Sequence, residues 1–204
     1  WNVRPQETVV GQPFYSVKAS ISGQRDEYRV TGFIEVPPLP SAVYIDTSEA
    51  NDVKTGDFFT VRVAVRNIRT FYGAEIVVEY DPHHLELVGG ALGVDRGPLF
   101  IDVQGEGEGE RLYLPWNAPV HQVYPDGVRA TVRFGGERRG ATQLFLVSDR
   151  LATLRFRALS PGEHEIRFVP DETRIFDRYG QTVNVERLMN AVITVHDRRL
   201  KRSR

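Results

Sequence analysis

Alternation of apolar and polar residues constrains the fold of this chain more than any other feature. In residues 59–66 the odd positions are apolar and the even ones mostly polar. The same period of two recurs in residues 74–80, 128–134, 152–158 and 165–168. Successive side chains of a β-strand point to opposite faces, so each segment predicts a strand with one buried and one solvated face. Such strands are typical of an antiparallel sheet packed on one side.

Turn residues separate these segments, and helical periodicity is almost absent. The turn signals are Thr55-Gly56-Asp57, Asp81-Pro82, Gly89-Gly90, Pro125-Asp126-Gly127, Ser160-Pro161-Gly162 and Tyr179-Gly180. The one helix candidate is a turn or two in residues 185–189. The chain has 204 residues, 41% of them hydrophobic, which is enough for one β domain with its own core. The sequence therefore predicts an all-β fold, an antiparallel β-sandwich.

A proline-rich segment, residues 37–40, is the clearest internal boundary. Proline fixes φ and lacks an amide donor, so we expect a stiff, extended connector. Ahead of it lie two strand-like segments, residues 9–21 and 28–36, which cannot enclose a core alone. This arm must pack on the main sandwich, belong to a preceding domain or pair with another molecule. The predicted organisation is a β arm at 1–36, a connector at 37–41, a sandwich at 42–196 and a basic tail at 197–204.

Charge, hydropathy and cysteine content exclude several classes of protein. There are 26 basic and 27 acidic residues, a net charge of -1, so no global field attracts nucleic acid. No apolar stretch approaches the about 20 residues that span a bilayer. The absence of cysteine excludes a disulfide framework and any thiolate metal site. The chain begins at Trp1 without an initiator Met, which predicts a processed product or an excised segment.

No catalytic motif is visible. His83 and His84 are neighbours, so their side chains cannot easily chelate one ion. No Gly-x-Ser-x-Gly elbow or comparable nucleophile motif exists. Acidic residues gather at Asp46, Glu49 and Asp52, and at Asp171, Glu172 and Asp177, where turn formation is the favoured interpretation. We predict a protein that is not an enzyme, with no catalytic residue and no cofactor; a structural calcium ion in one of these loops is left open.

Two other segments leave alternatives open. Residues 105–110 alternate glycine and glutamate without a hydrophobic anchor, which predicts a solvated loop; a calcium-responsive or partner-contacting loop is the alternative. Trp116 follows proline in an aromatic segment and suggests either sugar stacking or a core plug. The only other tryptophan, Trp1, is far away in the sequence.

Residues 72–88 carry the most specific motif of the chain. Tyr72-Gly73-Ala74-Glu75-Ile76 leads to Tyr80-Asp81-Pro82 and then to Leu85-Glu86-Leu87-Val88. Asp81-Pro82 makes the turn that reverses the chain, and the two leucines return to the core. Together with Val43-Tyr44-Ile45-Asp46, residues 56–67, residues 151–162 and Ala191-Val192-Ile193-Thr194-Val195, this order resembles a cohesin domain over residues 42–196.

The resemblance implies a nine-stranded jelly roll that binds another protein, usually a calcium-loaded dockerin, without catalysis. The N-terminal arm, an additional two-strand element, lies outside the pattern, as does the extra length between residues 99 and 124. No Asp-x-Asp/Asn-x-Asp/Asn-Gly calcium loop is present, so the chain is not itself a dockerin.

The strand order that the resemblance implies also predicts a partner-binding surface. It places the strand of Glu75 between the strand of Arg133 and the strand of Arg167, so that an acidic row lies between basic rows. One interpretation is a cross-strand ion-pair lattice, and the other is a partner-binding face with Val77 and Thr131 as its uncharged centre; both can hold. The predicted face comprises Glu75, Val77, Glu79, Arg129, Thr131, Arg133, Glu165 and Arg167. The opposite sheet would be basic, through Arg62, Arg66, Arg155 and Arg157.

We therefore expect an extracellular or cell-surface interaction module that binds a dockerin-like protein. The alternative is a self-assembling filament or surface-layer subunit, whose arm donates strands to another copy. The residues that would donate are Val9, Val10, Phe14, Val17, Ala19 and Ile21. A carbohydrate-binding module is the third possibility.

Overall fold

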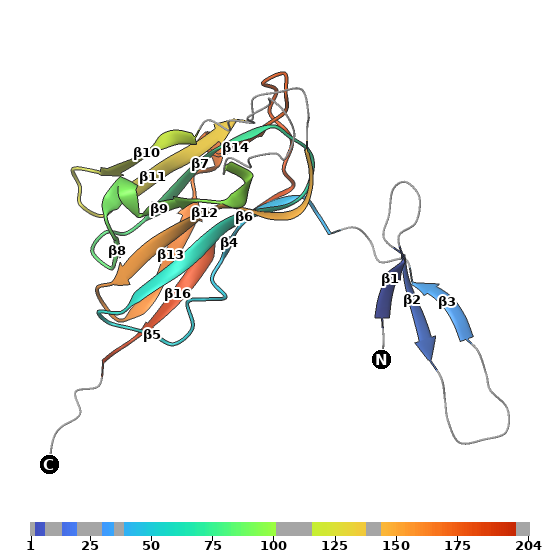
Figure 1. The fold of residues 1–204 in the computed structure, drawn as a ribbon. Helices are drawn as coiled ribbons and strands as arrows, with labels where there is room; N and C mark the ends of the chain where they lie inside the picture. Colours follow the sequence, from blue (N-terminus) through green and yellow to red (C-terminus); the bar gives the residue numbers. More distant parts are fainter. Residues whose placement is uncertain are drawn as a thin grey trace, which may run out of the picture. The chain divides into compact units, whose positions relative to one another are not determined.

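The computed structural model shows the alternating segments as strands of a β-sandwich (Figure 1). It describes residues 39–100, 116–137 and 144–198, together with three strands nearer the N-terminus. The predicted loop at 105–110, residues 37–38 of the connector, residues 199–204 of the tail and Trp1 lie outside the described residues. The chain divides into two compact units, residues 1–39 and 40–204.

The N-terminal unit contains three strands, where the sequence predicts two. They are β1 (Val3–Gln6), β2 (Phe14–Ala19) and β3 (Val30–Ile34), antiparallel in the order β1-β2-β3. The prediction of a two-strand arm is wrong because Pro5 hides β1, and an edge strand tolerates the missing amide donor.

The position of β2 bears on strand donation. Phe14, Val17 and Ala19 lie on β2, which is paired with β1 on one side and β3 on the other. Its backbone groups are therefore already used within the unit, and it presents no free edge to another molecule. The remaining donor residues of the prediction, Val9, Val10 and Ile21, lie outside the described residues.

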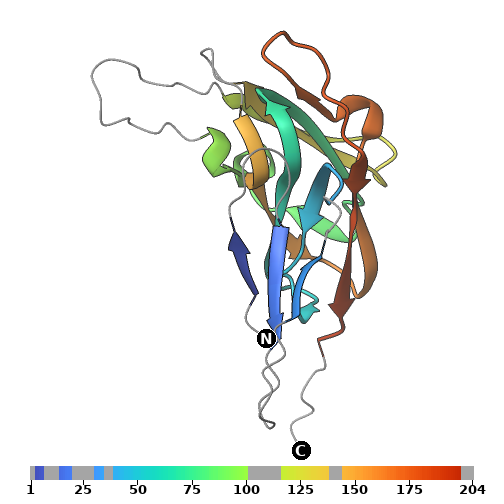
Figure 2. The ribbon, with the colours of Figure 1, turned by 90° about the vertical axis from the view of Figure 1, so that its right-hand side faces the viewer.

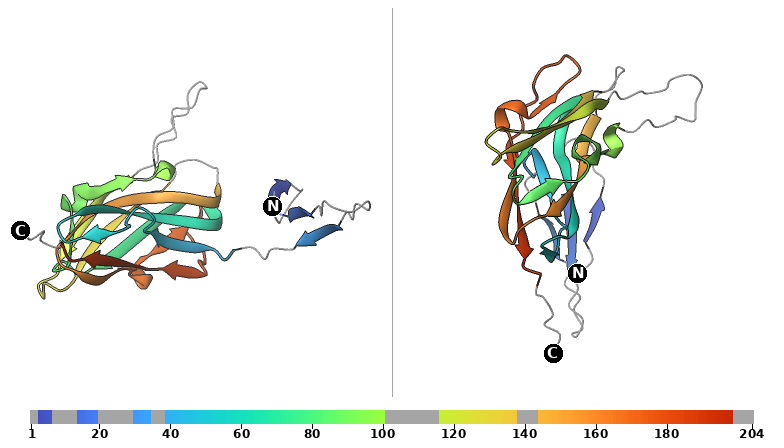
Figure 3. Two further views of the ribbon diagram at one scale, coloured as in Figure 1. Left: turned by 90° about the horizontal axis from the view of Figure 1, so that it is seen from below. Right: turned by 90° about the vertical axis from the view of Figure 1, so that its left-hand side faces the viewer.

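The second unit consists of two sheets packed face to face (Figure 3). The seven-stranded sheet has the order β10-β11-β7-β13-β16-β5, with β14 also paired to β7. Strands β13 and β16 lie side by side along one side of the sandwich (Figure 2). The bounds are β10 (Trp116–Val123), β11 (Ala130–Glu137), β7 (Gly73–Tyr80), β13 (Gly162–Phe168), β16 (Ala191–His196), β5 (Val53–Lys54) and β14 (Arg174–Phe176).

The six-stranded sheet has the order β15-β4-β6-β12-β8, with β9 also paired to β12. Its strands are β15 (Arg187–Met189), β4 (Ala42–Asp46), β6 (Phe58–Phe71), β12 (Leu144–Ala158), β8 (Leu85–Leu87) and β9 (Val94–Arg96). All pairs in both sheets are antiparallel except β15 with β4 and β16 with β5. Residues 187–189 form strand β15, so the prediction of a helix at 185–189 is wrong. The sequence could not reveal this strand, because three residues are too few to show a period of two.

The helical structure of the described residues is limited to three 3-10 turns, η1 (Gly90–Gly93), η2 (Pro98–Phe100) and η3 (Pro170–Glu172). No described helix is long and apolar enough to cross a membrane.

The inward residues of the alternating strands form one core between the sheets. Tyr80 of β7 packs edge-on against Phe156 of β12, with ring centroids 5.1 Å apart. Trp116 packs against Phe100 at 5.1 Å and Phe134 at 6.0 Å, so it belongs to the edge of this core. This packing fits the interpretation that Trp116 fills the edge of the core, and nothing among the described residues supports sugar stacking.

Candidate protein-binding face

The outer face of the seven-stranded sheet brings the predicted site residues together. Strand β7 lies between β11 and β13, as the resemblance implies. Thr131 and Arg167 are the two cross-strand neighbours of Glu79. Arg133 is the neighbour of Val77. The charged residues of three strands therefore form one continuous surface.

Arg133 ties three elements of this surface together. Its guanidinium pairs with Glu75 of β7 and with Glu172 of η3, which lies on the other side of β7. Arg133 is the cross-strand neighbour of Val77, and Glu172 lies on the far side of β7. The ion pair between Arg133 and Glu172 therefore passes over Val77. Sequence alone placed Glu172 in a loop and gave no signal that it would reach this sheet.

Val77 is buried, with 2% of its surface exposed. The pair of Arg133 with Glu172 covers it, and Thr173 binds its backbone on the same side: the amide of Val77 donates to Oγ1 at 3.3 Å, and Oγ1 donates to its carbonyl at 3.2 Å. The prediction that Val77 is the uncharged centre of a contact surface is wrong. Its outward direction was correctly predicted, but the residues that cover it are distant in sequence.

Glu79 is the most enclosed carboxylate of the face, with a side chain 11% exposed. The Nε atom of Arg167 donates to its Oε1 at 3.0 Å, and Arg129 approaches Oε2 at 3.9 Å. The hydrogen bond from Arg167 to Glu79, followed by their charge attraction, raises the pKa of the Arg167 guanidinium. Arg129 is held in place on its other side by the ring of Tyr124, 3.8 Å from the guanidinium carbon.

These ion pairs order the side chains of the face more than they stabilise the fold. Most of its side chains are about half exposed, and such pairs contribute roughly 0.2–1 kcal/mol each. Each guanidinium is nevertheless fixed by one or two partners. A partner that contacts this face therefore meets charges that need little ordering on binding.

The face also has an exposed apolar residue that the sequence analysis did not single out. Val120 of β10 stands opposite Arg133 and is 56% exposed. Gln122 lies opposite Thr131, which is partly exposed. Residues 120–123 are Val-His-Gln-Val and show no alternation, and they lie in the segment outside the resemblance, so no signal in the sequence pointed to Val120. At the other side of the face, Asn190 donates to Glu165 at 3.2 Å.

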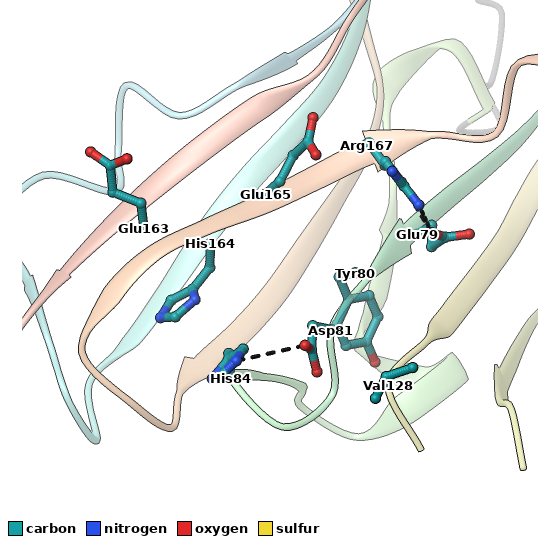
Figure 4. A pocket seen from close by; sticks show the side chains of 9 residues that line it. All are labelled: Glu79, Tyr80, Asp81, His84, Val128, Glu163, His164, Glu165 and Arg167. Carbon is teal, nitrogen blue, oxygen red and sulfur yellow. Dashed lines mark hydrogen bonds and ion pairs between the residues drawn. The ribbon is translucent and has the colours of Figure 1, made fainter. Parts of the chain in front are cut away.

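A pocket of about 240 Å³ lies at the end of β7 and β13 (Figure 4). The rings of His84 and His164 stack in it, with centroids 4.7 Å apart. Ser160 Oγ lies 2.7 Å from His84 Nδ1, and Asp81 Oδ2 lies 3.6 Å from His84 Nε2. A nucleophilic triad needs the serine on Nε2 and an aspartate hydrogen-bonded to Nδ1, so this row has the wrong order and too long an acid contact.

The histidines and acidic loops that the structure describes form no cluster for a metal ion. His83 and His84 both face Asp81, at 3.2 and 3.6 Å, and His84 Nδ1 is already taken by Ser160. Asp46 Oδ1 accepts the amide of Ser48, and Asp177 Oδ1 accepts those of Tyr179 and Gln181, all at 2.9 Å. In residues 39–100, 116–137 and 144–198, no three His, Asp or Glu side chains are grouped to hold an ion. A structural calcium ion stays a prediction.

Beneath the face, the buried Tyr80 and the partly exposed His121 form a polar pair at the edge of the core. The Tyr80 hydroxyl lies 2.7 Å from His121 Nε2, and the rings are nearly parallel. Burial raises the pKa of Tyr80 to about 12 and lowers the pKa of His121 below its usual 6.5. His121 is thus favoured in its neutral form, in which Nε2 can accept a hydrogen bond from the Tyr80 hydroxyl.

An all-β sandwich that presents one outer face of mutually paired charges is typical of protein-interaction modules. The profile of the cohesin domain matches residues 42–195. The chain belongs to the cohesin domain family.

Solved structures agree with this fold. A type II cohesin from the cellulosome of Acetivibrio cellulolyticus is 18% identical, with a TM-score of 0.56 over 76% of this chain and 95% of that one. A non-cellulosomal cohesin of the archaeon Archaeoglobus fulgidus is 16% identical, with a TM-score of 0.54 over 78% and 92%. A type I cohesin–dockerin complex from Clostridium thermocellum matches at 14% identity and 0.54, over 80% and 98%. A comparison with curated protein sequences finds no match.

Proposed function

We propose that this chain is a dockerin receptor and that it binds its partner through the outer face of β10, β11, β7 and β13. The observation that carries the proposal is family membership over residues 42–195, together with a preordered charged surface on one sheet. Similar structures include cohesins in complex with dockerins. The binding surface consists of Glu75, Glu79, Arg129, Thr131, Arg133, Glu165 and Arg167, joined by Val120 and Gln122.

The exposed valine gives the face an apolar contact among its charges. Protein interfaces combine an apolar centre with a polar rim, and the charges set register and partner choice. Val120 lies beside Arg133 at 56% exposure, so a partner can bury it without any rearrangement of the sheet. Val77 cannot take this role, because it is already buried in the free protein.

A binding experiment with a substitution at Val120 tests the face. Wild type is titrated calorimetrically against a panel of calcium-loaded type I and type II dockerins, and Val120→Asp is then titrated against the dockerin that binds. Burial of a new charge in the contact, in place of an apolar side chain, weakens binding at least tenfold, which corresponds to about 1.4 kcal/mol. The matched control, Tyr179→Asp, changes an exposed residue in the loop after β14 and keeps affinity within about twofold.

Two results contradict the proposal. Binding by no dockerin in the panel would contradict the partner class. Equal affinity of wild type and Val120→Asp would contradict the face while leaving the receptor function intact.

The cellular setting extends the same proposal. A dockerin receptor of this family fits an extracellular or cell-surface scaffold, to which the chain would contribute a binding site. Self-assembly by strand donation is less favoured, because β2 is already paired on both sides.

A further inference from the structure

The outer face of the six-stranded sheet carries a second surface, on the side of the sandwich opposite the proposed dockerin site. Its arginines come from the two long central strands β6 and β12. Arg150 stands beside Ala64, which lies between Arg62 and Arg66 on β6, so three arginines surround one small residue. We call the following residues the arginine face: Arg62, Arg66, Arg150, Arg155 and Arg157.

Two hydroxyl groups lie among these arginines. Tyr44 of β4 is the other neighbour of Ala64, and its hydroxyl reaches Ser148 Oγ on β12 at 3.3 Å. The tyrosine must therefore cross β6 above Ala64, which is 6% exposed although it points outward. The Arg66 guanidinium lies over the Tyr44 ring, 5.7 Å from its centroid. Guanidinium and hydroxyl donors are thus grouped around the covered residue Ala64.

Three of the five cations lack a carboxylate partner. Arg62 pairs with Glu49, and Arg157 approaches Glu86 at 3.9 Å. Within the part of the chain that the structure describes, no carboxylate lies within ion-pair distance of the remaining three: Arg66, Arg150 and Arg155. Asp46 and Asp95 also lie on this face, as the cross-strand neighbours of Arg62 and Thr153, but among the described residues neither pairs with Arg66, Arg150 or Arg155.

The guanidinium groups are also partly desolvated. The Nε atoms of Arg62, Arg66 and Arg150 are buried and have no hydrogen-bond partner among the described residues. A buried donor without a partner is unfavourable, and a charge that has already lost water loses less on binding an anion. All three atoms lie around Ala64, where an anionic group can approach the terminal nitrogens.

Phe58 orders the other end of the face. It is 56% exposed, and the guanidinium carbons of Arg155 and Arg157 lie 5.1 and 5.8 Å from its ring centroid. These cation–π contacts hold both side chains and occupy the ring. The two cations are two residues apart on one strand, so they point the same way about 7 Å from each other.

We infer that the arginine face docks a carboxylate-bearing polysaccharide. Carboxylates pair with the free guanidinium groups, and sugar hydroxyls exchange hydrogen bonds with Tyr44 and Ser148. The side chains at 62 and 66 are spaced by about 13 Å along β6, which suits a polymer that repeats its charge.

The composition of the face favours a polysaccharide over other anionic polymers. A protein partner needs an apolar centre, but Ala64 in the middle of the face is only 6% exposed and lies beneath Tyr44. A single-stranded nucleic acid needs free aromatic rings on which bases stack, whereas the rings of Tyr44 and Phe58 carry guanidinium groups.

Affinity electrophoresis and calorimetry with polygalacturonate at low ionic strength test the inference. Wild type binds, and binding weakens steeply as salt is raised because the contacts are ionic. The variant Arg66→Gln/Arg150→Gln loses at least tenfold in affinity. The control Arg174→Gln/Arg178→Gln removes the same charge from exposed positions near β14 and stays within twofold. Thermal unfolding of each variant verifies that it is folded.

Each other outcome overturns the inference. Absence of polygalacturonate binding by wild type removes it outright, as does equal loss in both double variants. Equally tight binding of hydroxyethylcellulose shows that charge is not recognised. Binding of polyglutamate or single-stranded DNA as tight as that of polygalacturonate, with the same sensitivity to Arg66→Gln/Arg150→Gln, would assign the face to an acidic protein or a nucleic acid instead.

Discussion

At the scale of single residues, burial on this sandwich depends on which side chains cross a strand as well as on which face a residue occupies. Val77 points outward in the alternation of β7, yet an ion pair and a threonine cover it. Ala64 points outward from β6 and is covered by Tyr44. In both cases a long polar side chain from a neighbouring strand shields a small apolar one, which is a common use of amphipathic side chains.

The substitution Val77→Ala separates a structural role of this residue from a binding role. Loss of two buried methyl groups is expected to lower the free energy of unfolding by about 1.5–2.5 kcal/mol. Dockerin affinity of the folded protein is expected to stay unchanged, because Val77 contacts no partner. Urea unfolding and calorimetric titration measure the two effects. Reduced affinity with unchanged stability would restore Val77 to the contact surface.

His121 predicts a pH dependence of stability. Burial lowers its pKa in the folded protein below 6.5, so the unfolded chain binds more protons as the pH falls through this range. Its contribution to stability is therefore complete above about pH 6.5 and is lost as the pH falls towards the lower folded pKa. The variant His121→Gln keeps an acceptor for Tyr80 but does not titrate. Its unfolding free energy is expected to fall less than that of wild type between pH 7.5 and 5, and equal slopes would contradict this assignment.

At the scale of elements, one glycine permits the close pairing of β11 with β7. Gly135 has φ +154°, and a Cβ atom there would lie 2.1 Å from the carbonyl oxygen of Ala74. It also pairs with Asn117, where β10 shifts its register. Any larger residue must push apart the strands that carry Arg133 and Glu75.

The substitution Gly135→Ala is expected to destabilise the domain by about 2–3 kcal/mol, through backbone strain and overlap with β7. Gly180 supplies the control: it has φ +75° but open space around it, so Gly180→Ala costs about 1 kcal/mol from conformation alone. Chemical denaturation of both variants gives the comparison. A smaller loss at Gly135 than at Gly180 would show that β11 can move away from β7 without difficulty.

The sequence predicted the long strands well, because β6, β7, β11, β12 and β13 alternate apolar and polar residues over several positions, although β7 is buried on both faces. It failed for β1 and β15. Pro5 conceals the first, and three residues cannot display a period in the second. The strand order came from the family resemblance, since alternation alone does not say which strands pair.

The candidate site was predictable in part for the same reason. The residues Glu75, Glu79, Arg133 and Arg167 follow from alternation and strand order, and the structure brings them together. Glu172 could not be predicted, because it reaches the sheet through η3, whose path over β7 depends on tertiary packing.

At the scale of the whole molecule, the cohesin unit is a sandwich with two unlike outer faces. The seven-stranded sheet presents charges that are mostly paired with each other, together with exposed Val120. The six-stranded sheet presents five arginines, of which three have no carboxylate within ion-pair distance among the described residues. Because each face belongs to a different sheet, a protein and a polysaccharide could be bound at the same time without competition.

The position of the dockerin on this sandwich is the most direct test of the central claim. Backbone amide signals of the isotope-labelled chain are recorded by NMR before and after addition of a dockerin that binds. The account predicts chemical-shift changes concentrated on β10, β11, β7 and β13, with β4, β6 and β12 little affected. Changes concentrated on β4, β6 and β12, or on the N-terminal unit, would contradict it.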